Sequence, residues 1–274
     1  MKDKVVIITG ASDGIGAVAA QELHALGATV VVVGRSPEKT KKVADQINAA
    51  YYTADFSKLD EVRELAQVLK RDYPRIDILI NNAGGIFGDR ELTIDGHEKT
   101  MQVNHLAPFL LTNLLIDTLI KDKAIIINTS SIANQRFGDL NLDDIELTKG
   151  YNANRAYGNA KLANIMFTRE LHSRYGAQGI STAAVHPGIV GTNFANDTKS
   201  VMRFLYHTPL SKLFLETPRQ GAEPLIWLAT TTPGVEWESG QYYNKKKVGK
   251  VNKKSSDAAA AKKLWDFSTV AVGL

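Results

Sequence analysis

Short runs of apolar, mostly β-branched residues recur along the chain, and stretches with apolar positions at helical spacing separate them. Each run is almost continuously apolar, which is typical of strands buried on both faces of a parallel sheet. The pattern predicts strands at Val5–Thr9, Thr29–Val33, Tyr51–Ala54, Ile76–Ile80, Ala124–Asn128, Ile180–His186 and Gly240–Tyr243.

The amphipathic stretches between these runs predict helices. Strands and helices that alternate in this way form right-handed crossovers, so we expect an α/β fold with a single Rossmann-type, doubly wound parallel sheet and helices on both faces. Pro187-Gly188 ends one strand, and Ser256 is a candidate cap for the last helix. The predicted helices are Ile15–Leu26, Glu38–Asn48, Leu59–Arg71, His97–Ile120, Ala153–Tyr175, Glu223–Ala229 and Ser256–Phe267.

The segment 193–216 is rich in large apolar residues but has no clean helical face. We interpret it as a lid over the carboxyl edge of the sheet that caps a mostly apolar pocket. Packing of the lid onto the core, or a contact in a homo-oligomer, would explain the same composition. No repeat or linker divides the chain, so residues 1–274 are predicted to form one domain. The apolar residues are Phe194, Val201, Met202, Phe204, Leu205, Tyr206, Leu213 and Phe214.

The net charge of +4 has a local origin, because six lysines near the C-terminus supply more than the whole excess. We interpret them as a solvated loop, and weak contact with an acidic membrane surface or partner is the alternative. The rest of the chain has no general basic field, and no aromatic residues repeat among the lysines, so no nucleic-acid partner is expected. These lysines are Lys245, Lys246, Lys247, Lys250, Lys253 and Lys254.

The chain contains no cysteine, which excludes disulfides and thiolate metal sites and fits a reducing cytoplasm. The most apolar long stretch, Leu106–Ile120, is interrupted by Pro108, Asn113 and Asp117, so no transmembrane helix is predicted. The first apolar run starts too early for a signal peptide to precede it. No metal site is expected, because His24, His97, His172 and His207 show no paired spacing with carboxylates.

A glycine-rich loop follows the first strand and opens the first helix. Gly10 permits a tight turn, Gly14 lets the backbone approach a pyrophosphate, and Gly16 allows close packing of helix on strand. The N-terminus of the helix then offers free N–H groups to phosphate. A purely structural glycine turn is the alternative, but the strand before the loop and the helix after it favour a dinucleotide site.

This loop, Thr9-Gly10-x-x-x-Gly14-x-Gly16, resembles the signature of the short-chain dehydrogenase/reductase family. Further motifs follow in that family's order, and the resemblance covers nearly the whole chain. They are Asp55 after the third strand, Asn81-Asn82-Ala83-Gly84 after the fourth, Asn104 in the next helix, Ser130-Ser131 after the fifth strand, Tyr157-x-x-x-Lys161 on a helix, and Pro187-Gly188-Ile189-Val190-Gly191-Thr192.

A finer resemblance is to the retinol dehydrogenase and WW-domain oxidoreductase branch of that family. The gap between Ser131 and Tyr157 is also longer than in the family's commonest arrangement, as in this branch. The segments that carry the resemblance are Val103-Asn104-His105-Leu106, Lys161-Leu162-Ala163-Asn164, Val185-His186-Pro187-Gly188 and Lys263-Leu264-Trp265.

The resemblance implies an enzyme that interconverts an alcohol and a carbonyl, with Tyr157 as the acid/base. A free tyrosine has a pKa of about 10 and is a poor proton partner near neutral pH. Lys161 lies four residues further on the same helix, so its ammonium is expected to favour the phenolate and lower that pKa. Without the other motifs, the two would be an ordinary surface pair. The resemblance also implies that Lys161 holds the ribose hydroxyls of the nicotinamide half.

Two further polar residues complete the expected catalytic set. The resemblance implies that Ser131 orients the substrate oxygen, and Ser130 is the competing hydroxyl. Asn104 is expected to support a water beside Lys161 and so complete a proton relay to solvent. A buried asparagine that bonds the backbone inside its helix is the alternative.

The end of the second strand predicts the cofactor. Folds that select NAD place an acid there for the ribose 2′-hydroxyl, but this chain has Gly34, followed by Arg35 and Ser36. Arg35 can bind a 2′-phosphate and stack on adenine, so NADP(H) is expected over NAD(H), although a plain surface arginine is the alternative. Asp13 departs from the pattern, because many NADP-binding relatives carry a basic residue there. The expected cofactor-binding residues are Gly10, Ser12, Gly14, Ile15, Gly16, Arg35, Ser36, Asp55, Phe56, Asn81, Ala83, Gly84, Tyr157, Lys161, Pro187, Gly188, Val190 and Thr192.

Two other functions compete with this one. A non-catalytic NADP-binding sensor would share the fold, but such sensors tend to lose the Tyr-Lys pair, which this chain keeps. A nucleotide-sugar epimerase or dehydratase differs in glycine spacing and has a longer C-terminal domain. The apolar segment 193–216 predicts a lipophilic aldehyde, ketone or alcohol as the substrate.

Overall fold

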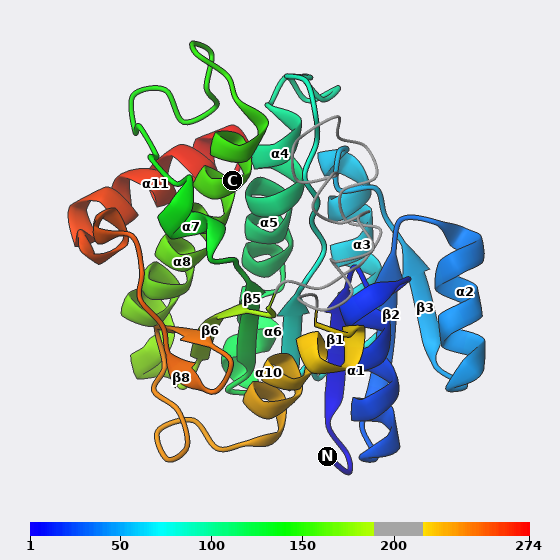
Figure 1. Cartoon of the computed structure of the whole chain (residues 1–274). Helices are drawn as coiled ribbons and strands as arrows, with labels where there is room; N and C mark the ends of the chain where they lie inside the picture. Colours follow the sequence, from blue (N-terminus) through cyan, green and yellow to red (C-terminus); the bar gives the residue numbers. More distant parts are fainter. Residues whose placement is uncertain (189–215) are drawn as a thin grey trace.

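A computed structural model describes residues 1–188 and 216–274 (Figure 1). In this part of the chain, eight strands form a single sheet in the order β3-β2-β1-β4-β5-β6-β7-β8. Strands β1 to β7 are parallel, and the order reverses between β1 and β4. This confirms the predicted doubly wound α/β fold. Ligands bind such sheets at the carboxyl ends of the strands, near the point where the order reverses.

The strands lie within one or two residues of the predicted positions, with two differences. Strand β3 is an edge strand with mostly exposed side chains, so the expectation of burial on both faces is wrong there. The two-residue β8, which pairs antiparallel with β7, lies inside the lysine-rich stretch and was not predicted. The strands are β1 Val5–Thr9, β2 Thr29–Gly34, β3 Ala50–Thr53, β4 Ile78–Asn81, β5 Ile125–Thr129, β6 Ser181–His186, β7 Gln241–Asn244 and β8 Lys247–Val248.

Helices cover both faces of the sheet, and each layer shares a buried apolar core with it. The first layer contains α1 (Gly14–Ala25), α2 (Pro37–Gln46) and α10 (Pro218–Thr230). The second contains α3 (Leu59–Asp72), α5 (Ala107–Leu114), α6 (Ile116–Lys121) and α8 (Ala153–Tyr175). Helix α8, which carries Tyr157 and Lys161, has the predicted bounds. The 3-10 turn η2 (Gly176–Gln178) leads from α8 toward β6.

Three predicted helices differ from the observed ones. The stretch 97–120 is divided into α4 (Lys99–Met101), a π-helical turn η1 (Gln102–Leu106), α5 and α6. Helix α10 begins at Pro218 rather than Glu223, because Thr217 and Gln220 form a capping box, a signal that the sequence contains. The last helix, α11 (Ala258–Ala271), is capped by Asp257 rather than by Ser256.

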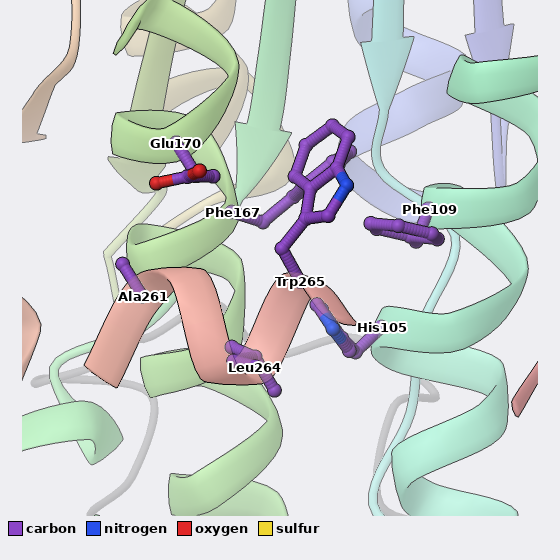
Figure 2. A pocket seen from close by; sticks show the side chains of 7 residues that line it. All are labelled: His105, Phe109, Phe167, Glu170, Ala261, Leu264 and Trp265. Carbon is purple, nitrogen blue, oxygen red and sulfur yellow. The ribbon is translucent and has the colours of Figure 1, made fainter. Parts of the chain in front are cut away.

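Helix α11 packs against α8 and α5 through an aromatic cluster (Figure 2). The ring of Trp265 lies 4.9 Å from that of Phe109 and 5.8 Å from that of Phe167, between ring centres. Arg174 lies over the indole, with its guanidinium carbon 4.3 Å from the ring centre. The pocket lined by Phe109, Phe167, Trp265 and their neighbours has no room for a water molecule. The cluster therefore serves to attach the C-terminal helix.

In the residues described, no helix is both long and apolar enough to cross a bilayer. Within the same two ranges, no three His, Cys, Asp or Glu side chains gather where they could hold a metal ion. Apart from Glu216, the predicted lid at 193–216 lies outside the described residues.

Candidate active site

The glycine-rich loop lies directly against the end of β4. Gly10 has a φ of +64°, and a Cβ there would lie 2.7 Å from the Cα of Ala83. A Cβ at Gly16 would lie 2.4 Å from the carbonyl oxygen of Gly10. The Asn82 side chain donates to the carbonyls of Thr9, at 3.1 Å, and Gly10, at 3.3 Å. The glycines are therefore required by close approach, and an amide side chain holds the loop in place.

Asp13 caps helix α1 at the mouth of this loop. Its carboxylate accepts from the N–H of Gly14 at 2.7 Å. That N–H is one of the donors that a helix N-terminus offers to phosphate. The glycine cradle fits a pyrophosphate, but the Asp13 carboxylate has to give up this bond, or repel the phosphate, when one binds.

Position 34, at the end of β2, has no space for a side chain. A Cβ at Gly34 would lie 2.4 Å from Oγ1 of Thr40 and 2.7 Å from Cβ of Ser12. An acid that would bind a ribose 2′-hydroxyl therefore cannot stand there. Arg35, the next residue, is exposed, and Ser36 caps α2 by accepting from the N–H of Lys39. The edge of the site thus presents an arginine beside a helix N-terminus.

Several residues expected to bind the cofactor turn their side chains away from the sheet edge. The Asn81 amide is buried, where it donates to Thr112 and Asn128. Phe56 is packed in the core. Only the main chain of these two residues is left for a cofactor. Asp55 accepts from the N–H and hydroxyl of Ser57, which forms a tight turn after β3.

Lys161 is the most unusual group of the site, because its side chain is buried in the interior. Its ammonium donates to the carbonyl oxygen of Thr129 at 3.1 Å, and the Asn164 side chain donates to the same oxygen at 3.1 Å. Burial lowers the pKa of Lys161 to about 7. A Cβ at Gly84 would lie 3.2 Å from the Lys161 nitrogen and 2.5 Å from Oδ1 of Asn104, so this glycine lets both groups meet at the end of β4.

Asn104 lies in the π-helical turn η1, fully buried. Its amide nitrogen donates to the carbonyls of Gly85, at 2.9 Å, and Thr100, at 2.8 Å, and its oxygen accepts from the N–H of Gly85 at 3.1 Å. The side chain thus bonds both its own turn and the loop after β4, and π turns are frequent at functional sites. The predicted alternative, a buried asparagine that bonds the backbone, therefore describes these contacts.

The two serines after β5 have different surroundings. Ser130 is buried, and its hydroxyl donates to the carbonyl of Lys161 at 2.7 Å. Ser131 is partly exposed, and its hydroxyl oxygen accepts from the N–H of Ala133 at 3.2 Å. The Ser131 hydroxyl thus keeps its own proton available for a substrate, whereas that of Ser130 is directed into the protein.

Tyr157 lies one turn before Lys161 on α8, and the Lys161 nitrogen is 5.4 Å from its ring centre. The ring packs with Ile86, from the loop after β4, and Ala133, from the short helix α7 (Ala133–Arg136) after Ser131. Side chains from α8 and from the segments that follow β4 and β5 therefore meet at the carboxyl edge of the sheet. Pro187 and Gly188 end β6 at this edge, while Val190 and Thr192 lie outside the described residues.

Comparison with known families decides the class of this site. The model of the family described as short chain dehydrogenase matches residues 4–202. The chain belongs to the short-chain dehydrogenase family. It is therefore an oxidoreductase that acts on alcohols and carbonyls.

The relatives of this dehydrogenase indicate its branch. It is 39% identical to a Streptomyces protein (strain C5) named "Putative daunorubicin C-13 ketoreductase", over 98% of this chain and 93% of that one. It is 37% identical to mouse retinol dehydrogenase 14, over 100% and 87%. A crystal structure of a Shigella flexneri short chain dehydrogenase complexed with NADP is 27% identical, with a TM-score of 0.68 over 90% and 98%. These matches confirm the resemblance to the retinol dehydrogenase branch.

Three polar side chains at this dehydrogenase's site were not assigned a role from the sequence. Asn82 holds the phosphate loop, Asn164 shares the Thr129 carbonyl with Lys161, and Thr9 accepts from the N–H groups of Asn82 and Ala83. All three are part of motifs that the sequence displays, so their presence was visible. Their partners were not, because all these contacts join different strands and helices.

Proposed function

We propose that this enzyme is an NADP(H)-dependent oxidoreductase that interconverts a lipophilic alcohol and its carbonyl, with Tyr157 as the proton donor and acceptor. The observation that carries the proposal is the buried Lys161, one helical turn from Tyr157 and beside Gly84 and Asn104. Lysine is seldom buried without a carboxylate partner, and a strongly lowered pKa in such a place points to function rather than stability.

Proton transfer at the substrate oxygen is the role of Tyr157 in this mechanism. A bound nicotinamide would supply or accept the hydride at the adjacent carbon. The Tyr157 hydroxyl donates its proton to the oxygen in reduction and removes it in oxidation. Lys161, with a pKa of about 7, exists as both ammonium and amine near neutral pH and can restore the proton to the tyrosine.

Ser131 and Asn104 complete the machinery. The partly exposed Ser131 hydroxyl donates to the substrate oxygen and orients it, while the buried Ser130 ties the strand end to α8. Asn104 joins the main chain of Gly85 to the π turn and thereby keeps Gly84 close to Lys161. A water held there would link Lys161 to solvent.

The cofactor preference rests on the edge of the sheet near β2. Gly34 excludes an acid, and Arg35 stands beside the capped N-terminus of α2, where a 2′-phosphate would be neutralised. In the phosphate loop, Gly10, Gly14 and Gly16 are among the other expected contacts. The NADP complex of the Shigella relative supports this preference.

The lipophilic substrate rests on sequence and on relatives. The apolar segment 193–216 comes a few residues after β6 in the sequence, and the named relatives include a retinol dehydrogenase and a ketoreductase. Next to Tyr157, the described part of the pocket offers the apolar side chains of Ile86 and Ala133. The single domain, the homo-oligomer and the cytoplasmic location stay predictions.

Replacement of Tyr157 by phenylalanine tests the mechanism, because it removes the proton donor and keeps the ring. We expect turnover to fall at least about 10²-fold, the scale of lost acid–base catalysis, with NADPH affinity nearly unchanged. Tyr175→Phe, the same change further along α8, is the matched control and should leave turnover unchanged. Full turnover in Tyr157→Phe would refute the mechanism. If the wild-type protein binds NADPH but reduces none of the carbonyls in a broad panel, the alternative of a non-catalytic NADP-binding sensor is favoured instead.

A further inference from the structure

The segment that carries Ser131 is held from outside the sheet by residues near the C-terminus. We call residues 131–140 the serine loop and residues 250–254 the C-terminal strap. The strap follows β8 and contains three of the lysines that the sequence interpretation assigned to a solvated loop. Alternate residues of the strap bond the serine loop: Lys250 accepts at its carbonyl from Gln135, Asn252 bonds Asn134 and Gly138, and Lys254 bonds Asp139 and Leu140.

Asn134 is the inner link of this arrangement, and it is fully buried. Its side-chain nitrogen donates to the carbonyl of Ser131 at 2.7 Å, and its own N–H donates to the same carbonyl at 3.0 Å. Its side-chain oxygen accepts from the N–H of Asn252 at 3.0 Å. The carbonyl of Ser131 thus has two donors, one of which is oriented by the strap.

Asn252 is the outer link. Its side-chain nitrogen donates to the carbonyls of Gly138, at 2.8 Å, and Asn134, at 3.3 Å. Its side-chain oxygen accepts from the N–H of Lys254 at 3.0 Å and caps the 3-10 helix η5 (Lys253–Ser256). The two ends of the amide therefore have different roles: the oxygen caps η5, and the nitrogen bonds the serine loop.

The other side of the serine loop lies on the catalytic helix. A Cβ at Gly158, the residue after Tyr157, would lie 2.7 Å from the N of Gly138. The buried Asn159 accepts from the N–H of Asp139 at 2.7 Å. The loop is consequently held between α8 and the strap, and a shift of either moves Ser131 relative to Tyr157.

We propose that Asn252 and Asn134 are positioning residues for Ser131, and that the C-terminal strap sets the place of the catalytic hydroxyl. The inference rests on the proposed role of Ser131 in orienting the substrate oxygen. Catalytic groups have to be held within about 0.5 Å of their productive position, and displacements near 1 Å reduce rates by large factors. The strap, which contacts the serine loop and no part of the phosphate loop in the described structure, is placed to affect kcat rather than cofactor binding.

The test uses Asn252→Ser, since serine can still cap η5 but cannot reach the two carbonyls. We expect kcat with saturating NADPH to fall about tenfold, on the scale of a misplaced reacting group, with NADPH affinity unchanged. Asn252→Asp keeps the cap and turns a carboxylate oxygen toward the same carbonyls, so it should be at least as harmful. Lys246→Ala, at an exposed position outside the strap, is the control and should be neutral.

The same changes in a Ser131→Ala background distinguish positioning from general damage. If Asn252 acts through Ser131, Asn252→Ser should cause no further loss of kcat in that background. An equal loss in both backgrounds, or no loss in either, overturns the inference. Thermal melting of each variant accompanies the assay. A loss of kcat in a variant that melts at the wild-type temperature supports the inference, and a loss seen only where the melting temperature falls below the assay temperature overturns it. Full turnover of Ser131→Ala itself would instead overturn the proposed role of the serine, and the inference with it.

Discussion

The charge of Lys161 should make the enzyme less stable than it would be without it. Lys161 is 2% exposed, and in the described part of the chain its ammonium bonds a carbonyl and pairs with no carboxylate. Methionine has a similar length and flexibility and carries no charge. Lys161→Met should therefore raise the free energy of unfolding of the cofactor-free protein at neutral pH while abolishing turnover, which is the trade expected of a functional buried charge.

The magnitude follows from the pKa, which burial lowers from 10.5 to about 7. Each pKa unit corresponds to about 1.4 kcal/mol, so the charged form carries a penalty of a few kcal/mol. Loss of the bond to Thr129 offsets about 1 kcal/mol of the gain. We expect Lys161→Met to be more stable by a few kcal/mol below pH 7.

The stability difference between Lys161→Met and the wild type should depend on pH. Below pH 7 the lysine is protonated in both states, and the folded protein bears the full penalty. Between about pH 7 and 10.5 the unfolded chain holds a proton that the folded protein has released, so wild-type stability rises with pH and the advantage of the variant shrinks.

Urea unfolding followed by tryptophan fluorescence at pH 6, 7.5 and 9 would measure this difference. Lys246→Met, at an exposed position, is the matched control and should show no pH-dependent change. A difference between Lys161→Met and wild type that is independent of pH, or a variant less stable at every pH, would refute the reasoning.

Three further outcomes are expected. NADPH should bind more tightly than NADH in a fluorescence titration, and Arg35→Ala should erase most of the gap, about 1.5–3 kcal/mol for a charge-assisted bond; equal wild-type affinities would contradict this. His97 joins Glu146, at 2.7 Å, to the carbonyl of Ala271, at 2.9 Å, and its hydrogen bond to Glu146 raises its pKa. The stability that this bond contributes is complete below the unfolded pKa of about 6.5 and is lost as the pH rises through the folded pKa. His97→Gln should therefore lower the free energy of unfolding in urea more at pH 5.5 than at pH 8.5. A loss that is the same at both pH values would contradict this prediction. In a series of straight-chain aldehydes, kcat/KM should rise with chain length and then level off. Each added methylene should lower the activation free energy that kcat/KM reports by up to about 0.8 kcal/mol. A flat series would argue against a lipophilic pocket.

The sequence was sufficient for the frame of this protein and for its central pair. Continuous β-branched runs such as 5–9 form strands in a doubly wound sheet because only a parallel sheet covered on both faces buries them fully. The four-residue spacing of Tyr157 and Lys161 puts both on one side of α8 once that segment is helical. These signals depend only on residues that are close in the sequence, so they can be recognised without the structure.

Tertiary packing decided what those residues contact. The sequence shows that residue 34 is glycine, but the reason, that Thr40 and Ser12 fill its side-chain space, comes from three segments that meet. The difference between Ser130 and Ser131 depends on which hydroxyl faces α8. The bond between Asn134 and Asn252 spans 118 positions, and no local pattern encodes it. Close packing selects such contacts only after the sheet has formed, because interiors tolerate few arrangements that fill space and satisfy every buried polar group.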